Sequence, residues 1–140
     1  MHATLPYLEP SDFPAILRKK LEIVQVNLGY LCNLSCTHCH VNASPKRTEL
    51  MELATIDLVL DFVRSNNIHT LDLTGGAPEM NPHFKYLVEK AREMDLQVID
   101  RCNLVILEES GYEDIAEFLA RHQVEITASL PCYLEDNVDK

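Results

Sequence analysis

Long hydrophobic runs and basic patches are both missing from this 140-residue sequence. No stretch of 18 consecutive apolar residues occurs, so the sequence predicts no membrane-spanning helix. Lysine and arginine number 12 against 22 aspartates and glutamates, and their longest cluster is Arg18–Lys20. Because a stripe of positive charge dominates binding to phosphate backbones, we expect no nucleic-acid partner.

The N-terminus also lacks the features of a secretory signal: a basic start, a continuous apolar segment and a small-residue cleavage site. A cytoplasmic location is therefore expected. Five cysteines are present, an odd number, and in a reducing compartment we expect them to be metal ligands or reactive thiols rather than disulfides. With 46% hydrophobic residues, the chain can bury a core without such cross-links.

A repeating order of strand, loop and helix follows an irregular, proline-marked lead-in at residues 1–20. Apolar, β-branched runs predict strands at 21–28, 68–74, 96–100 and 124–130. Apolar residues at helical spacing predict helices at about 49–65, 82–94 and 112–122, with Thr55 and Asn81 as candidate N-caps. The predicted inner stripes of the first and third helices are Leu53, Ile56, Val59, Leu60 and Val63, and Ile115, Phe118 and Leu119.

Successive strand-helix units of about 30 residues are typical of a parallel α/β sheet. A closed barrel of this kind takes eight strands, so residues 21–140 are expected to form the N-terminal portion of a partial (β/α) barrel, apparently from a truncated chain. A complete small open sheet is the alternative. In parallel βα topology every strand-to-helix loop reaches the same edge, so residues after each strand are expected to gather there.

The segment CNLSCTHCH, residues 32–40, places Cys32, Cys36 and Cys39 in a C-x3-C-x2-C pattern after the first predicted strand. Thiolates favour zinc or iron–sulfur clusters over magnesium or calcium. A structural zinc ion needs a fourth protein ligand. The candidates for it are His38, His40, Cys102 and Cys132. An iron–sulfur cluster held by three cysteines instead leaves one iron open to a substrate or cofactor.

This cysteine pattern, followed by Gly75-Gly76 after the second strand, resembles the radical S-adenosylmethionine (SAM) superfamily. The resemblance implies that the three cysteines hold a [4Fe–4S] cluster whose fourth iron chelates the methionine moiety of SAM. It also implies an enzyme that reductively cleaves SAM to a 5′-deoxyadenosyl radical, served by an electron donor such as flavodoxin or ferredoxin. One departure is His38, where the family usually has an aromatic residue.

Four segments more narrowly resemble the arsenosugar-biosynthesis radical SAM proteins. They are CNLSCTHCHVNASPKR, LTGGAPEMNPHF, VIDRCNLVIL and ITASLPCYLEDNVD, which cover most of residues 27–139. This resemblance implies that the radical adds to dimethylarsinous acid, giving a 5′-deoxyadenosyl dimethylarsine compound on the way to arsenosugars. Two alternatives remain open: the same SAM chemistry on another small molecule or a peptide, and a zinc-binding module without catalysis.

Further site residues are predicted at the ends of the later strands. Place in the sequence and family resemblance together imply SAM contacts from Gly75, Gly76, Glu79, Arg101, Asn103 and Ser129. Simpler alternatives are a tight turn for the glycines and the serine, helix capping for the glutamate, and a surface ion pair for the arginine.

Cys102 and Cys132 fall on the same predicted edge, outside the cysteine triplet. Because trivalent arsenic is thiophilic, both are candidate substrate contacts, with an inert buried thiol as the alternative. His40 is a candidate proton carrier or hydrogen-bond donor to a cluster sulfur, with local packing as the alternative.

Overall fold

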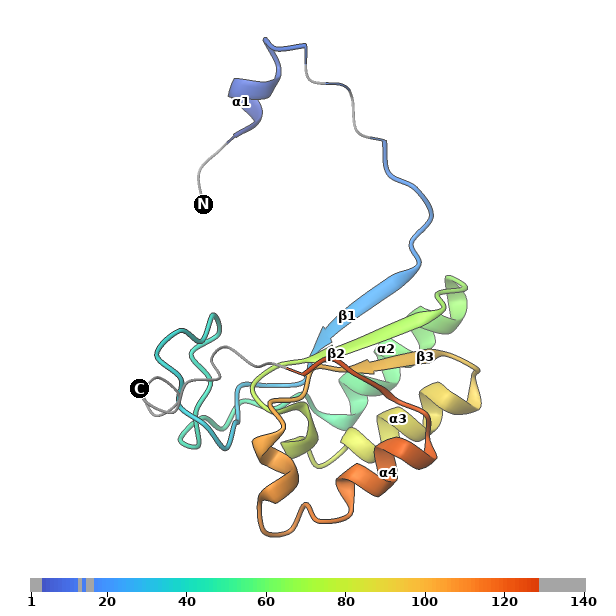
Figure 1. The fold of residues 1–140 in the computed structure, drawn as a ribbon. Helices are drawn as coiled ribbons and strands as arrows, with labels where there is room; N and C mark the ends of the chain where they lie inside the picture. The colour runs from blue at the N-terminus through green and yellow to red at the C-terminus, as the bar shows by residue number, and fades with distance from the viewer. Residues whose placement is uncertain (1–3, 13, 15–16, 129–140) are drawn as a thin grey trace.

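The computed structural model describes residues 4–12, 14 and 17–128 (Figure 1). Ser129, Cys132 and the last two residues of the strand predicted at 124–130 lie outside the described residues. Before residue 23, the described part of the chain forms one short helix, α1 (Leu5–Leu8), and all its residues are exposed. The packed part of the chain therefore begins at the first strand.

Four strands form one parallel sheet in the order β1-β2-β3-β4. They are β1 (Ile23–Asn27), β2 (Thr70–Thr74), β3 (Gln97–Asp100) and β4 (Glu125–Ile126). The register places Val26 opposite Leu73, and Leu73 opposite Asp100. The predicted α/β class with four parallel strands is confirmed, and the loops that follow the strands start from the same edge of the sheet.

Three helices, α2 (Leu53–Ser65), α3 (Phe84–Glu93) and α4 (Ile115–Arg121), lie on the same side of the sheet (Figure 1). Two short 3-10 helices, η1 (Pro78–Met80) and η2 (Val105–Glu108), lie in the loops after β2 and β3. The buried core between sheet and helices consists of Val26, Leu28, Ile56, Leu60, Val63, Ile68, Leu71, Leu73, Phe84, Leu87, Val88, Ala91, Leu96, Val98, Ile115, Phe118 and Leu119. Among the described residues, none of the helices has the length and apolar character needed to cross a membrane.

Alternate residues along each strand point to opposite sides of the sheet. Leu71, Leu73 and Val98 are fully buried on the helix side. The other side carries no helix in the described part of the chain, and polar side chains are bonded across it from strand to strand. Gln25 Nε2, for instance, donates to Asp72 Oδ2 at 2.9 Å. We call this side the open face and define it by Gln25, Asp72, Gln97, Arg101 and Glu125.

The predicted start of the first long helix is wrong. Helix α2 begins at Leu53 with Glu52 in the capping position, whereas a start near residue 49 and a cap at Thr55 were predicted. The residues before it are engaged elsewhere, because Glu49 O accepts the backbone N–H of Tyr30 at 2.9 Å. A helix cannot include backbone groups already paired with another segment. Of its predicted inner stripe, the buried members are Ile56, Leu60 and Val63.

The other two helices also begin later than predicted. Helix α3 starts at Phe84 rather than at Pro82, and the side chain of Asn81 accepts the backbone N–H of His83 at 2.8 Å in a turn that precedes the helix. Helix α4 starts at residue 115 rather than 112, after a turn in which Tyr112 N–H donates to the carbonyl of residue 109 at 3.1 Å. The predicted buried stripe of α4 is confirmed.

Candidate functional site

The cysteine loop, residues 28–52, leaves β1 and returns to α2 as a folded excursion. Its two arms are joined by backbone hydrogen bonds: Cys32 N–H donates to Ser44 O at 3.3 Å, and Ser44 N–H donates to Tyr30 O at 3.2 Å. Between the arms, Cys39 N–H donates to Cys36 O at 3.2 Å and closes a turn. The three cysteines therefore lie on one short arc whose base is fixed at the edge of the sheet.

The three cysteines of the loop differ in exposure. Cys32 is buried, Cys39 is half-buried and Cys36 is exposed. Cys32 Sγ accepts the side-chain amide of Asn103, from the segment after β3, at 3.7 Å. Cys39 Sγ accepts the backbone N–H of Ala43 at 3.3 Å. Hydrogen bonds to sulfur favour the thiolate, which is the form that binds metal.

Burial raises the pKa of the Cys32 thiol above its ordinary value, and the charges of Cys36 and Cys39 add to the rise. The N–H groups of Leu34 and Asn103 oppose it. Thiolates gathered in this way repel one another unless a cation joins them. The donor set of three soft thiolates fits a [4Fe–4S] cluster.

The spacing of these sulfur atoms bears on the zinc alternative. Among the described residues, the three loop cysteines are not a group whose donor atoms all lie within 4.8 Å of one another. A tetrahedral zinc site holds its ligand atoms roughly 3.5 Å apart. The loop is thus more open than a single zinc ion requires.

Gly75 and Gly76 bring the end of β2 against the start of the cysteine loop. Gly75 has a φ of +147°, and a Cβ there would lie 2.7 Å from Gly29 O. A Cβ on Gly76 would lie 2.3 Å from Leu31 O and 3.0 Å from Cys32 Cβ. Both glycines thus permit a close backbone approach that positions Cys32. Their contact with SAM stays a prediction.

Arg101 forms a bidentate ion pair on the open face. Its Nε and Nη2 donate to Asp72 Oδ1 and Oδ2, each at 2.8 Å. The Asp72 side chain is 8% exposed and that of Arg101 is 44% exposed. The hydrogen bonds from Arg101 hold the pKa of Asp72 below its ordinary value. An ion pair was the simpler alternative for Arg101, and its contact with the SAM carboxylate stays a prediction.

Asn103 connects the end of β3 to the cysteine loop. Besides the contact with Cys32 Sγ, its Nδ2 donates to Asn33 Oδ1 at 2.8 Å. Its Oδ1 accepts the backbone N–H of Ile106 at 3.0 Å. The side chain therefore fixes the position of β3's end relative to the first cysteine, a role that the sequence did not predict.

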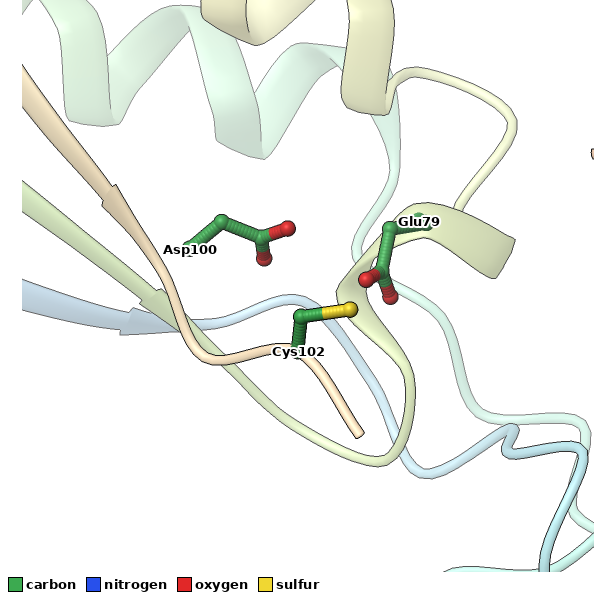
Figure 2. Close-up of side chains that lie close together, drawn as sticks. All are labelled: Glu79, Asp100 and Cys102. Atoms are coloured by element: carbon green, nitrogen blue, oxygen red, sulfur yellow. The ribbon is translucent and has the colours of Figure 1, made fainter. Parts of the chain in front are cut away.

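Glu79, Asp100 and Cys102 converge on the helix side of the sheet (Figure 2). One donor atom from each lies within 4.8 Å of the other two, and all three residues are buried. Burial, and after it the charge of Glu79, raises the pKa of Asp100 to about 8. Burial is also the main cause that raises the pKa of Cys102. Glu79 does not cap a helix, because its carboxylate has no hydrogen-bond partner among the described residues.

The sequence predicted that Cys32, Gly76 and Asn103 would lie at one edge of the sheet, and they do. It did not predict any role for Asp72 or Asp100. Each is a buried aspartate next to apolar strand residues, Asp72 within TLDLT and Asp100 at the end of QVID, and that interruption was the available signal. The predicted histidines, His38 and His40, are both exposed.

Comparison with known proteins identifies the family. The model of the radical SAM superfamily matches residues 26–135. A probable GTP 3′,8-cyclase of Sulfolobus acidocaldarius is 26% identical over 81 residues, which are 58% of this chain and 26% of that protein.

Two similar proteins come from Bacillus subtilis. The putative peptide biosynthesis protein YydG is 39% identical over 67 residues, 47% of this chain and 20% of that protein. The antilisterial bacteriocin subtilosin biosynthesis protein AlbA is 26% identical over 88 residues, 60% of this chain and 18% of that protein. The chain therefore spans about a quarter or less of the length of these relatives.

Proposed function

The chain belongs to the radical SAM superfamily, and from that premise we propose that it carries the cofactor-binding part of an enzyme that cleaves SAM reductively. Members of this superfamily use a [4Fe–4S] cluster and SAM. When bound, the cluster supplies one electron that breaks the C5′–S bond of SAM and yields methionine and a 5′-deoxyadenosyl radical. The protein's contribution is to hold, orient and shield these groups.

The observation that carries this proposal is the meeting of three strand ends at Cys32. The cysteine comes from the loop after β1, its Cβ faces Gly76 after β2, and its sulfur accepts the Asn103 amide after β3. In parallel α/β folds this edge of the sheet carries the ligand sites. We assign Cys32, Cys36 and Cys39 to the cluster.

SAM contacts are assigned to residues of the same edge. Backbone groups at Gly75 and Gly76 bind the SAM ammonium, and the Arg101 guanidinium, 44% exposed, pairs with its carboxylate. Asn103 acts as a hydrogen-bonding partner, and Ser129, which lies outside the described residues, is assigned the same role from the sequence alone. For Glu79 a SAM contact was also predicted, and its burial on the helix side favours a different role, argued below.

For the substrate, the resemblance of four segments to the arsenosugar-biosynthesis proteins leads us to propose dimethylarsinous acid. The 5′-carbon radical forms a bond to arsenic, and the adduct then gives up one electron and one proton. An electron acceptor is therefore required as well as a donor such as flavodoxin or ferredoxin. Cys102 and Cys132 are the thiols that the sequence offers as arsenic contacts.

Peptide modification is the second candidate, because YydG is 39% identical over 67 residues and is named as a peptide biosynthesis protein. In that reaction the radical would abstract hydrogen, so free 5′-deoxyadenosine would be released. With dimethylarsinous acid, the adenosyl carbon is instead retained in an arsenic adduct. The fate of the adenosyl group therefore separates the two candidates.

The test is anaerobic reconstitution with iron and sulfide, then dithionite and SAM. We expect about four iron atoms per chain and cleavage of SAM, with an adenosyl-arsenic product by mass spectrometry when dimethylarsinous acid is added. Cys36→Ala should abolish cleavage, whereas Ser35→Ala, a neighbouring exposed position, should not. Cleavage that survives Cys36→Ala would refute the cluster assignment, and free 5′-deoxyadenosine as the sole product would refute arsenic as the acceptor.

A further inference from the structure

Glu79, Asp100 and Cys102 form a second group of metal-ligand side chains, distinct from the cysteine loop (Figure 2). Glu79 lies in η1, Asp100 ends β3, and Cys102 follows two residues later. Glu79 is 4% exposed, and Asp100 and Cys102 are fully buried. Three different parts of the fold thus direct two carboxylates and a thiol into one interior point.

Both carboxylates in this group lack a hydrogen-bond donor from outside the group. Neither oxygen of Glu79 or of Asp100 has a hydrogen-bond partner among the described residues, and no ion pair described there includes either side chain. Buried carboxylates are nearly always paired, hydrogen-bonded or bound to metal, since an isolated buried charge is very unfavourable. Two adjacent ones require a neutralising proton or a cation.

We propose that Glu79, Asp100 and Cys102 bind a divalent transition-metal ion of the zinc or ferrous class. Zinc and ferrous iron accept mixed thiolate and carboxylate ligands, whereas magnesium and calcium take oxygen ligands alone. In a tetrahedral site the donor atoms would lie roughly 3.5 Å apart, and here each donor atom lies within 4.8 Å of the other two.

The surroundings of the group suit such an ion. Cys102 Sγ already accepts the backbone N–H of Leu104 at 3.2 Å, a bond that favours the thiolate. Cys102 belongs to a buried cluster with Cys32, Ala43, Ala77 and Ile106, so the group lies beside the base of the cysteine loop. A surface pocket lined by Glu79, Lys85 and Tyr112 adjoins the group and offers a route for an ion and for a water ligand.

This site uses ligands outside the cysteine loop, but two of them also have predicted roles in the radical chemistry. It shares no cysteine with the cluster loop, and a cation there would engage Glu79 and Cys102. It is therefore an alternative to the SAM contact predicted for Glu79 and to the substrate contact predicted for Cys102. Its role would be to tie η1, which follows Gly76, to the end of β3.

Cobalt titration of the full chain tests the proposal. In a chain carrying Cys32→Ser, Cys36→Ser and Cys39→Ser, we expect one Co²⁺ per chain with a thiolate-to-cobalt charge-transfer absorption. Cys102→Ser should remove that absorption, and Glu79→Gln or Asp100→Asn should each weaken binding at least tenfold. Asp57→Asn, which removes an exposed carboxylate, should leave binding unchanged.

A second readout covers variants that lose structure. Saturating Co²⁺ or Zn²⁺ should raise the Tm of the chain that lacks the loop cysteines, and should not raise it after Cys102→Ser. The proposal is wrong if no charge-transfer absorption forms, or if it persists without Cys102. Because the loop cysteines are absent, these outcomes are independent of SAM cleavage and of the proposed function.

Discussion

Cys32 is the residue at which the separate parts of the candidate site meet. It is buried, whereas the other two cluster cysteines reach toward solvent. Its neighbours Gly76 and Asn103 come from the ends of two other strands. A small change at either neighbour is therefore expected to alter the cluster without removing a ligand.

Gly76→Ala is the sharpest such change. The new Cβ would lie 2.3 Å from Leu31 O and 3.0 Å from Cys32 Cβ, so the backbone must move. We expect a loss of about 3 kcal/mol in the free energy of unfolding and lower iron content after reconstitution. Gly111→Ala is the control, because a Cβ there meets nothing within 4 Å, and its positive φ should cost about 1 kcal/mol. Urea denaturation showing equal losses for both variants would contradict the prediction.

Asp72 gives the domain a specific pH dependence. Its pKa is below the ordinary 3.8, chiefly because Arg101 bonds to it. The ion pair therefore stabilises the folded state fully above about pH 4, where the Asp72 carboxyl is ionised in the unfolded chain as well. This stabilisation is lost as the pH falls through the lowered pKa of Asp72 in the folded state. Asp72→Asn should cost about 1 kcal/mol at neutral pH, a modest value because Arg101 is 44% exposed, and progressively less in acid.

Denaturant unfolding across the acid range measures this difference. The control is Asp61→Asn, which breaks an ion pair with Arg64 in which both side chains are more than 60% exposed. That variant should show little loss at any pH. A constant difference between the parent and Asp72→Asn from neutral to acid pH would rule out the linkage.

The roles of Asp72 and Asp100 show the limit of prediction from single residues. An aspartate within an apolar strand is unusual, but the sequence alone does not give its side of the sheet or its neighbours. Both depend on strand register, because side chains alternate between the two sides of the sheet. Asp72 therefore faces Arg101 on the open face, whereas Asp100 faces Glu79 on the helix side. The sequence alone therefore could not predict that Glu79, Asp100 and Cys102 lie together, as Figure 2 shows.

Between elements, Asn81 joins three segments of the chain. It is 2% exposed, and its Nδ2 donates to Leu28 O at 2.9 Å and to Met51 O at 3.0 Å. Its Oδ1 accepts the His83 N–H just before α3. One side chain thus holds both ends of the cysteine loop and the start of a helix.

Asn81→Ala should therefore weaken the whole domain. Removing the amide breaks three hydrogen bonds, to the Leu28 carbonyl (which still accepts the Met51 N–H), to the half-buried Met51 carbonyl and from the His83 N–H, and we expect a loss of about 3 kcal/mol, about 1 kcal/mol for each bond. Asn66→Ala, which removes an exposed amide bonded to Phe62 O, should cost less than about 1 kcal/mol. Thermal unfolding followed by circular dichroism compares the two. Similar Tm values for both variants would show that Asn81 does not have this joining role.

The sequence predicted the positions of the strands better than the starts of the helices. The strands were located because runs such as LEIVQVNL are both apolar and β-branched, a signal held within a few residues. Helix starts were predicted too early at all three sites, because the residues just before them are engaged by distant segments before α2 and α3 and by a local turn before α4. Tyr30 bonds to Glu49, for example, and no local pattern contains that information.

For the whole molecule, the two sides of the sheet have different chemistry. All three long helices cover one side of the sheet (Figure 1) and bury an apolar core there, whereas the open face bears hydrogen-bonded polar groups such as Gln25, Asp72 and Arg101. Parallel sheets usually have both faces covered. A polar face without a covering helix is suited to binding a ligand. The open face adjoins the edge of the sheet at which the ends of β1, β2 and β3 meet.

The whole-molecule prediction is that SAM binds at this edge and not among the helices. Hydrogen exchange of the reconstituted chain, with and without SAM and without reductant, tests it. Amides at 27–32, 74–77 and 101–103 should exchange up to about a hundredfold more slowly at about 100 times the Kd, because exchange must then await dissociation. Residues 57–64 of α2, on the far side of the core, serve as the internal control. Protection confined to α2 and α3 would place SAM on the helix side and overturn the assignment of the strand-end edge, since a ligand protects the amides it covers.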